Sequence, residues 1–359
     1  MEQPNRSLLR ESNMELLRII AMFLVLMEHA NYWSLGAPTP LETHTAVLPS
    51  FTRFFFEGMS RCCVDVFILI SGWYGIRASV RGLAKFVFQC LFFGIGIYAV
   101  CLLTGFAPFG LRGIAGCFSL LHWDWFVKSY VLLYLLAPVL NSFVQQASQR
   151  QFGGLLAAFY LFQTLYGWSN AAGYFEQGFS AISFAGLYLL SRYLRLYVRT
   201  DRFGAPVYFG GYLLLVLATA CTAFAIKSAG YVRLSNGIYS YISPFVIGSA
   251  LCLLLAFARL RLQSRAVNRI AASSFSVLLL HMNPNLNIPL YKKWVRAIYA
   301  ANSGPVCLLK LGLLMLGVFA AAVLIDRIRI ACWRRIERAA DRSQRFGGLH
   351  RFWTEKSPL

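Results

Sequence analysis

Four ionisable side chains lie within or beside the first apolar stretch of the sequence, namely Glu15, Arg18, Glu28 and His29. Arg18 and His29 are eleven residues apart, which corresponds to about 20° around an α-helix and about 16 Å along it. A neutral imidazole can act as a general base near pH 7, so His29 is a candidate catalytic residue with Arg18 on the same face. A histidine that hydrogen-bonds between helices and an arginine that reaches the membrane surface would explain the pattern equally well.

The second apolar stretch begins with another ionisable group. Asp65 is expected at about the depth of His29, where its carboxylate could orient the imidazole or bind the acceptor. Pairing of Asp65 with Arg61 at the membrane surface is an equally good interpretation. Ser71 is a possible additional site residue, but its neighbours lack the signature of a hydrolase nucleophile. Together with the glycine that follows it, Ser71 favours close approach of two helices.

Basic residues recur at four-residue steps after this stretch, at Arg77, Arg81 and Lys85. If the segment is helical, the three side chains form one stripe at the cytoplasmic surface. Such a stripe could bind the phosphates of a cytoplasmic donor. It would equally suit lipid headgroups.

Two further side chains are possible additional members of the site. Trp125 opens the fourth apolar stretch, and His281 lies inside the ninth. A hydrogen bond that packs helices together near a proline competes with a catalytic role for His281. The nine cysteines show no zinc-ligand spacing, so no metal is predicted and free thiols are expected.

Membrane helices must position these residues, because 58% of the chain is hydrophobic and only 13% is charged. A soluble protein carries roughly a quarter charged residues. The apolar stretches are continuous rather than alternating, which predicts an all-α polytopic membrane protein rather than a barrel. Ten spans are predicted: Leu16–Leu35, Val64–Ile76, Leu83–Gly105, Trp125–Val144, Phe152–Trp168, Phe179–Leu196, Ala205–Ile226, Gly237–Phe257, Ala271–Leu290 and Pro305–Ile330.

The distribution of positive charge predicts the orientation. With the N-terminus in the cytoplasm, 23 of the 34 lysines and arginines fall in cytoplasmic segments, which places both termini inside. The net charge of +20 is therefore attributed to membrane topology and not to nucleic-acid binding. Residues 1–330 are predicted to form the transmembrane domain and residues 331–359 a basic cytoplasmic tail on the inner leaflet.

Three motifs, taken in order, resemble the acyltransferase 3 family of bacterial integral-membrane O-acyltransferases. They are Arg-x10-His in the first span, Val-Asp-Val-Phe-Ile-Leu-Ile-Ser-Gly-Trp at 64–73, and Leu-Leu-Leu-His-Met at 278–282. The resemblance extends from Met14 to about Ile330. The segment Trp-Phe-Val-Lys-Ser-Tyr at 125–130 looks like members that modify surface polysaccharides.

The resemblance implies about ten spans in a bacterial inner membrane and an acyl-CoA donor, usually acetyl-CoA, on the cytoplasmic side. The implied acceptor is a hydroxyl of a glycan or lipid-linked sugar. His29 matches the essential catalytic position, and Arg18 matches its partner in the first span. Arg77 and Arg81 look like the basic motif after the second span, although that motif is often a tighter arginine cluster.

The main alternative is a transporter or flippase of a lipid-linked glycan, which would explain the spans and buried charges without acyl-transfer chemistry. It predicts activity in the absence of acyl-CoA. The lack of a visible internal repeat counts against it. The face shared by Arg18 and His29 also counts against it.

Overall fold

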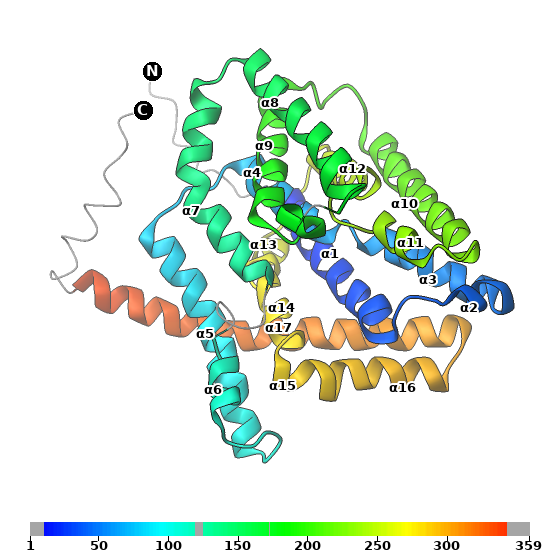
Figure 1. The fold of residues 1–359 in the computed structure, drawn as a ribbon. Coiled ribbons are helices and arrows are strands. Elements are labelled where there is room, and N and C mark those ends of the chain that lie inside the picture. The colour runs from blue at the N-terminus through cyan, green and yellow to red at the C-terminus, as the bar shows by residue number, and fades with distance from the viewer. Residues whose placement is uncertain (1–10, 119–124, 172, 343–359) are drawn as a thin grey trace.

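The computed structural model describes residues 11–118, 125–171 and 173–342, and every regular element in these ranges is a helix (Figure 1). This confirms the predicted all-α class. Within the described ranges, four helices are long and apolar enough to cross a membrane: α5 (Val80–Leu103), α7 (Trp125–Gln146), α10 (Ala205–Ser228) and α17 (Gly304–Arg342). The total of ten spans and the cytoplasmic position of both termini stay predictions.

Shorter helices occupy the other predicted spans: α1 (Ser12–Glu28), α4 (Cys63–Tyr74), α8 (Gln149–Phe162), α9 (Ala181–Tyr197), α12 (Pro244–Ala258), α13 (Arg265–Ala271) and α14 (Ser274–His281). The eighth predicted span, Gly237–Phe257, begins too early, because the helix starts at Pro244. Proline is favoured at the first position of a helix, where its missing N–H is not needed.

The ninth predicted span, Ala271–Leu290, is wrong as a single helix. It is divided into α14, α15 (Pro284–Leu286) and a π-helical turn η4 (Asn287–Lys292), and α13 ends at Ala271, where the span was predicted to begin. Pro284 explains one division, since a proline cannot donate a backbone hydrogen bond to a helix that continues through it. The side chain of Asn283 caps the new helix by accepting from the backbone N–H of Asn285 at 3.0 Å.

The remaining elements connect these helices: α2 (Pro40–Thr45), α3 (Val47–Ser60), α6 (Leu111–Gly116), α11 (Val232–Ile238), α16 (Lys293–Ala301), the π-helical turns η1 (His29–Trp33) and η2 (Gln163–Trp168), and the 3-10 turn η3 (Gly173–Gly178). Helix α3 was not predicted from the sequence, and only two residues, Arg61 and Cys62, separate it from α4. Helix α17 continues past Ile330, so the described part of the predicted tail, residues 331–342, is an extension of the last helix.

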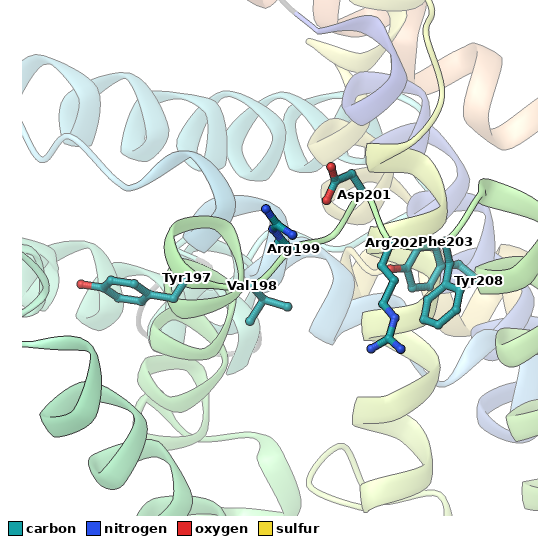
Figure 2. A pocket seen from close by; sticks show the side chains of 7 residues that line it. All are labelled: Tyr197, Val198, Arg199, Asp201, Arg202, Phe203 and Tyr208. Carbon is teal, nitrogen blue, oxygen red and sulfur yellow. The ribbon is translucent and has the colours of Figure 1, made fainter.

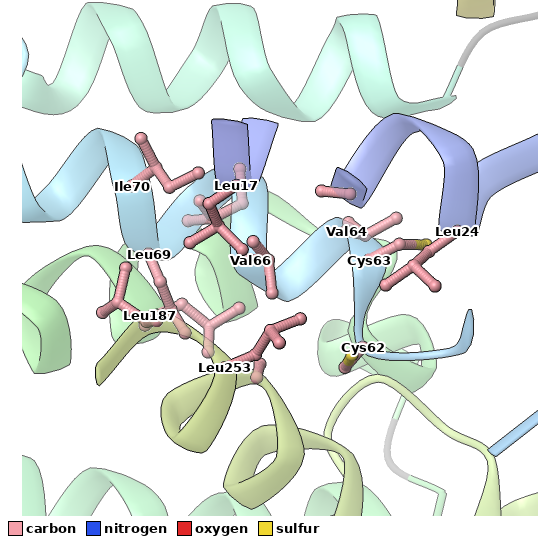
Figure 3. Packing of buried hydrophobic residues seen from close by; sticks show 14 of the residues in the cluster. Leu17, Leu24, Cys62, Cys63, Val64, Val66, Leu69, Ile70, Leu187 and Leu253 are labelled. Carbon is pink, nitrogen blue, oxygen red and sulfur yellow. The ribbon is translucent and has the colours of Figure 1, made fainter. Parts of the chain in front are cut away.

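The core lies where α1, α4, α9 and α12 meet, and it contains fully buried side chains such as Leu17, Val66 and Leu69 (Figure 3). Helix α4 approaches α9 closely at Gly72, where an added Cβ would lie 2.5 Å from the carbonyl oxygen of Tyr188. A small residue is therefore required at this contact, as the sequence predicted.

Contacts between distant segments define two ends of the bundle. At one end, Ser12 hydrogen-bonds to Ser264, and the Arg195 guanidinium stacks over Trp73. At the other end, the His44 imidazole contacts the Ser228 carbonyl. The first end, which contains Ser12, Trp73, Arg195 and Ser264, consists of segments that the charge distribution assigns to the cytoplasm. It is called the arginine-rich end below.

Candidate active site

Two histidines from opposite ends of the sequence meet inside the bundle. His29 Nδ1 lies 2.7 Å from His281 Nε2, although the residues are 252 positions apart. His281 Nδ1 lies 2.5 Å from the carbonyl oxygen of Val277, one turn earlier in α14. The structure therefore joins the first-span histidine to the histidine of the ninth predicted span, which sequence spacing alone could not show.

A carboxylate and a guanidinium complete this cluster. The carboxylate of Glu28 lies 3.1 Å from His29 Nε2 through Oε2 and 2.6 Å from Arg61 Nη1 through Oε1. The same arginine donates from Nε to the carbonyl oxygen of Tyr239 at 2.6 Å and lies over the ring of Tyr241 at 4.2 Å. Glu28, His29, Arg61 and His281 are called the histidine layer below.

Three helices are interrupted at the histidine layer. Helix α1 changes to a π-helical turn at His29, the turn that carries Arg61 separates α3 from α4, and α14 ends at His281. Single π-helical turns occur frequently at functional sites. Interrupted backbone at membrane depth is tolerated where it is buried in protein or lines a cavity. The arrangement is typical of a site built inside a membrane bundle.

The layer is partly accessible from outside the protein. The side chains of His29, Glu28 and Arg61 keep 14%, 10% and 16% of their surface exposed, whereas His281 is buried at 2%. His29 is therefore the more exposed of the two histidines. Its neighbours supply one negative charge, one positive charge and a second imidazole, a set suited to moving a proton.

Arg18 lies on α1, nearer the arginine-rich end than His29. Its guanidinium forms an ion pair with Glu15 at 2.6 Å, and its charge also acts on the hydroxyl of Tyr130. The hydroxyl of Ser71 also interacts with Tyr130 and donates to the carbonyl of Phe67 at 3.0 Å. Arg18 and Ser71 thus both interact with Tyr130, and within the described residues neither forms a hydrogen bond or ion pair with the histidine layer.

Asp65 differs from its predicted surroundings. It is fully buried, and in the described part of the chain neither of its carboxylate oxygens has a hydrogen-bond partner. The carboxylate beside the His29 imidazole is that of Glu28. The ion pair of Arg61 is likewise with Glu28 rather than with Asp65. A catalytic role for Asp65 stays a prediction.

The three basic residues after α4 do not form one helical stripe. Helix α5 begins at Val80, so Arg77 lies in the preceding loop and only Arg81 and Lys85 share a helical face. All three side chains are exposed at the arginine-rich end. The Arg81 guanidinium pairs with Glu337 of α17 at 3.1 Å.

Trp125 connects to the histidine layer through one ring. Its half-buried indole packs edge-on against Phe179, with ring centroids 4.5 Å apart, and lies 5.9 Å from the ring of Tyr241. Tyr241 in turn lies beneath the Arg61 guanidinium. Trp125 is therefore part of an aromatic wall beside the layer.

A separate hollow of about 870 Å³ lies where α9 connects to α10 (Figure 2). Arg199, Asp201, Arg202, Phe203 and aromatic side chains of both helices line it. None of the predicted site residues lines it, so the hollow is not the candidate active site. Among the described residues, no group of three or more histidines, cysteines and carboxylates is placed to hold a metal ion.

Comparison with known proteins decides the family. The model of a family described as an acyltransferase domain, the acyltransferase 3 family, matches residues 11–327. The chain belongs to this family. Searches of the curated proteins and of the solved structures give no match. The family membership and the apolar helices together identify a membrane acyltransferase.

Arg61 belongs to the candidate site of this acyltransferase, although its sequence position suggested only a pairing with Asp65. A signal was present, because Glu57 and Arg61 are four residues apart within an otherwise apolar segment. Glu57 is buried in α3, and Arg61 is half-buried in the turn that follows it. Ionisable residues in such segments are functional candidates by default.

Proposed function

We propose that this acyltransferase moves an acyl group, namely acetyl, from acyl-CoA to a hydroxyl of a cell-surface glycan or lipid-linked sugar. His29 is the general base, and the protein resides in a bacterial inner membrane. The observation that carries the proposal is the histidine layer, where a partly exposed imidazole contacts a carboxylate and a second imidazole. The family membership supports acyl transfer as the reaction.

The donor would approach from the arginine-rich end. Arg77, Arg81 and Lys85 are exposed there and can bind the phosphates of CoA, because guanidinium and ammonium groups form strong charge-assisted hydrogen bonds with phosphate. Arg18 lies on α1 between this end and His29 and would contact the pantetheine arm or line its passage. The acceptor hydroxyl would meet the thioester beside His29, next to the aromatic wall that includes Trp125.

The reaction then needs one proton carrier. His29 accepts the proton of the acceptor hydroxyl while the hydroxyl oxygen attacks the carbonyl carbon of the thioester. When the carbon–sulfur bond breaks, the CoA thiolate leaves and takes up the proton from His29. Glu28, at 3.1 Å, balances the positive charge that the imidazole carries between these steps.

Mass spectrometry of surface glycans from cells with and without the protein tests this function. We expect a mass difference of one acyl group, which also identifies the donor, and we expect His29→Ala to abolish it. His44→Ala is the matched control, because His44 lies at the opposite end of the bundle from the donor residues. Unchanged glycan masses, together with acyl-CoA-independent movement of a lipid-linked glycan, would favour a flippase instead.

A further inference from the structure

We propose that His281 is a positioning residue that fixes which nitrogen of His29 exchanges the proton, and that this nitrogen is Nε2. The inference rests on the proposed function, because it assigns a role within that reaction. Its basis is a chain of short contacts that begins at a backbone carbonyl of α14 and ends at Glu28.

The first link fixes the tautomer of His281. The carbonyl oxygen of Val277 can only accept a hydrogen bond, so His281 Nδ1, which lies 2.5 Å from it, carries a hydrogen. Two adjacent imidazolium rings would repel each other in a buried site, which keeps His281 neutral while His29 takes up a proton. A neutral imidazole has a single N–H, so His281 Nε2 is an acceptor.

The second link transfers this constraint to His29. Its Nδ1 lies 2.7 Å from His281 Nε2, a separation that places one hydrogen between the two nitrogens. Because His281 Nε2 accepts, the hydrogen belongs to Nδ1 of His29. Nε2 is then the nitrogen that gains and loses a proton. It lies 3.1 Å from Glu28 Oε2, so the form that Glu28 stabilises is the protonated one, in which Nε2 donates to the carboxylate.

The backbone around both histidines is held in place. The side chain of Asn287 donates to the carbonyl of His281 at 3.0 Å and accepts from the indole N–H of Trp33 at 3.2 Å. Trp33 ends the π-helical turn that begins at His29, so Asn287 links the two interrupted helices directly. The Ser34 hydroxyl also donates to the carbonyl of His29 at 2.6 Å. The pair is therefore positioned before any substrate binds.

Other titratable groups near the pair do not replace His281. The ring of Tyr291 lies 5.3 Å from that of His281, but its hydroxyl donates to the carbonyl of Leu26 at 2.7 Å. Arg61 contacts Glu28, and Glu57 lies 3.9 Å from Arg61. None of these groups contributes a hydrogen bond to Nδ1 of His29 in the described part of the chain. His281 provides that contact.

Two substitutions of His281 distinguish a role in positioning His29 from a role in packing alone. In the purified full-length protein, His281→Leu removes the acceptor for Nδ1 of His29, and we expect kcat to fall by about 10² to 10⁴-fold. KM for acetyl-CoA should stay within about twofold, because donor binding is not altered. In His281→Gln the amide oxygen can accept from Nδ1, so kcat should stay within about tenfold of the wild-type value. His44→Leu is the control and should be unchanged.

A spectroscopic measurement tests the inference without measuring turnover. In protein labelled with ¹⁵N-histidine, Nε2 of His29 should be the nitrogen that loses its proton as pH rises, in the wild type and in His281→Gln. In His281→Leu, Nδ1 of His29 has no acceptor, so the titrating proton should no longer be confined to Nε2. Titration of Nδ1 in the wild type would overturn the inference, as would a His281→Leu enzyme with the kcat of the control. If His29→Ala retains full activity, the proposed function fails, whatever the titration shows.

Discussion

Two regions of the bundle bury charged side chains, and they do so in different ways. In the first region, Asp326 accepts from Arg329 at 2.8 and 2.7 Å and from Gln89 at 3.3 Å. Gln89, Asp326 and Arg329 are called the clamp below. Both ionic groups lie on α17 within uninterrupted helix, and the exposed fractions of Asp326 and Arg329 are 0% and 2%.

The residues of the histidine layer, in contrast, come from three chain segments. A helix ends or changes its geometry at each segment, and His29 is partly exposed. A closed ion pair on one helix holds α17 against α5 and offers nothing to a substrate. An open cluster at three interrupted helices is costly to build, and it is suited to chemistry. Backbone breaks and residual exposure therefore distinguish a candidate site from a structural ion pair, whereas burial of charge alone does not.

The largest effect on stability is expected at the clamp. Asp326→Ala leaves Arg329 buried without its partner, which should lower the free energy of unfolding by about 3–5 kcal/mol. The kcat of the folded fraction should not change. Heat-induced unfolding of the purified protein, followed by circular dichroism, measures the loss. The double variant Asp326→Leu/Arg329→Leu should recover most of it, and a stable but inactive Asp326→Ala enzyme would place the clamp in the site instead.

At the histidine layer, the expected loss is in rate rather than in stability. Glu28→Gln keeps an acceptor for Arg61 but removes the charge that balances the His29 imidazolium, so kcat should fall by about 10- to 100-fold. Initial rates at saturating donor and acceptor measure this effect. Glu57→Gln makes the same charge change next to Arg61 and should cost less than about threefold. Equal losses in the two variants would argue against a specific role for Glu28.

Packing between α4 and α9 gives an intermediate effect. Gly72→Ala would force a methyl group against the carbonyl of Tyr188 and the side chain of Ser191, and should lower the unfolding free energy by about 1–3 kcal/mol. Gly96→Ala in α5 is the matched control, because nothing lies within 4 Å of its added Cβ. Unfolding curves of the two variants in one detergent provide the test. If both shift equally, helix propensity rather than close approach decides the outcome.

The smallest effect is expected at the surface. Glu337→Gln breaks the ion pair with Arg81, whose side chain is 52% exposed, so stability should change by only about 0–1 kcal/mol. The change should become smaller as salt is added, because exposed charges are screened. Unfolding midpoints at low and high ionic strength test this. A loss as large as that of Asp326→Ala would mean that the pair belongs to the clamp and not to the surface.

The sequence could predict the long helices and three of the four residues of the histidine layer as site candidates, namely Glu28, His29 and His281. Continuous apolar runs place α7 and α10 within two residues of their observed ends, since length and composition alone specify such helices. Glu28 and His29 were found because ionisable groups are rare in apolar segments. Both signals are local, so no knowledge of the fold was needed.

The rest depends on contacts that spacing cannot reveal. The pairing of His29 with His281 joins segments 252 residues apart, and no periodic pattern encodes it. Arg61 was considered only as a possible partner of Asp65, because helix α3, which precedes it, was not predicted. The pairing of Arg61 with Asp65, one of the two interpretations given for Asp65, does not form, since Arg61 pairs with Glu28 on α1 instead.

The most direct test of the central claim is the initial rate of labelled acetyl transfer from acetyl-CoA to the glycan acceptor, measured with purified wild-type protein and His29→Ala. Equal amounts of folded protein are compared, and His44→Ala serves as the control. We predict that His29→Ala loses about 10² to 10⁴-fold in rate while His44→Ala retains the wild-type rate. Transfer by His29→Ala at the wild-type rate would contradict the assignment of His29 as the base.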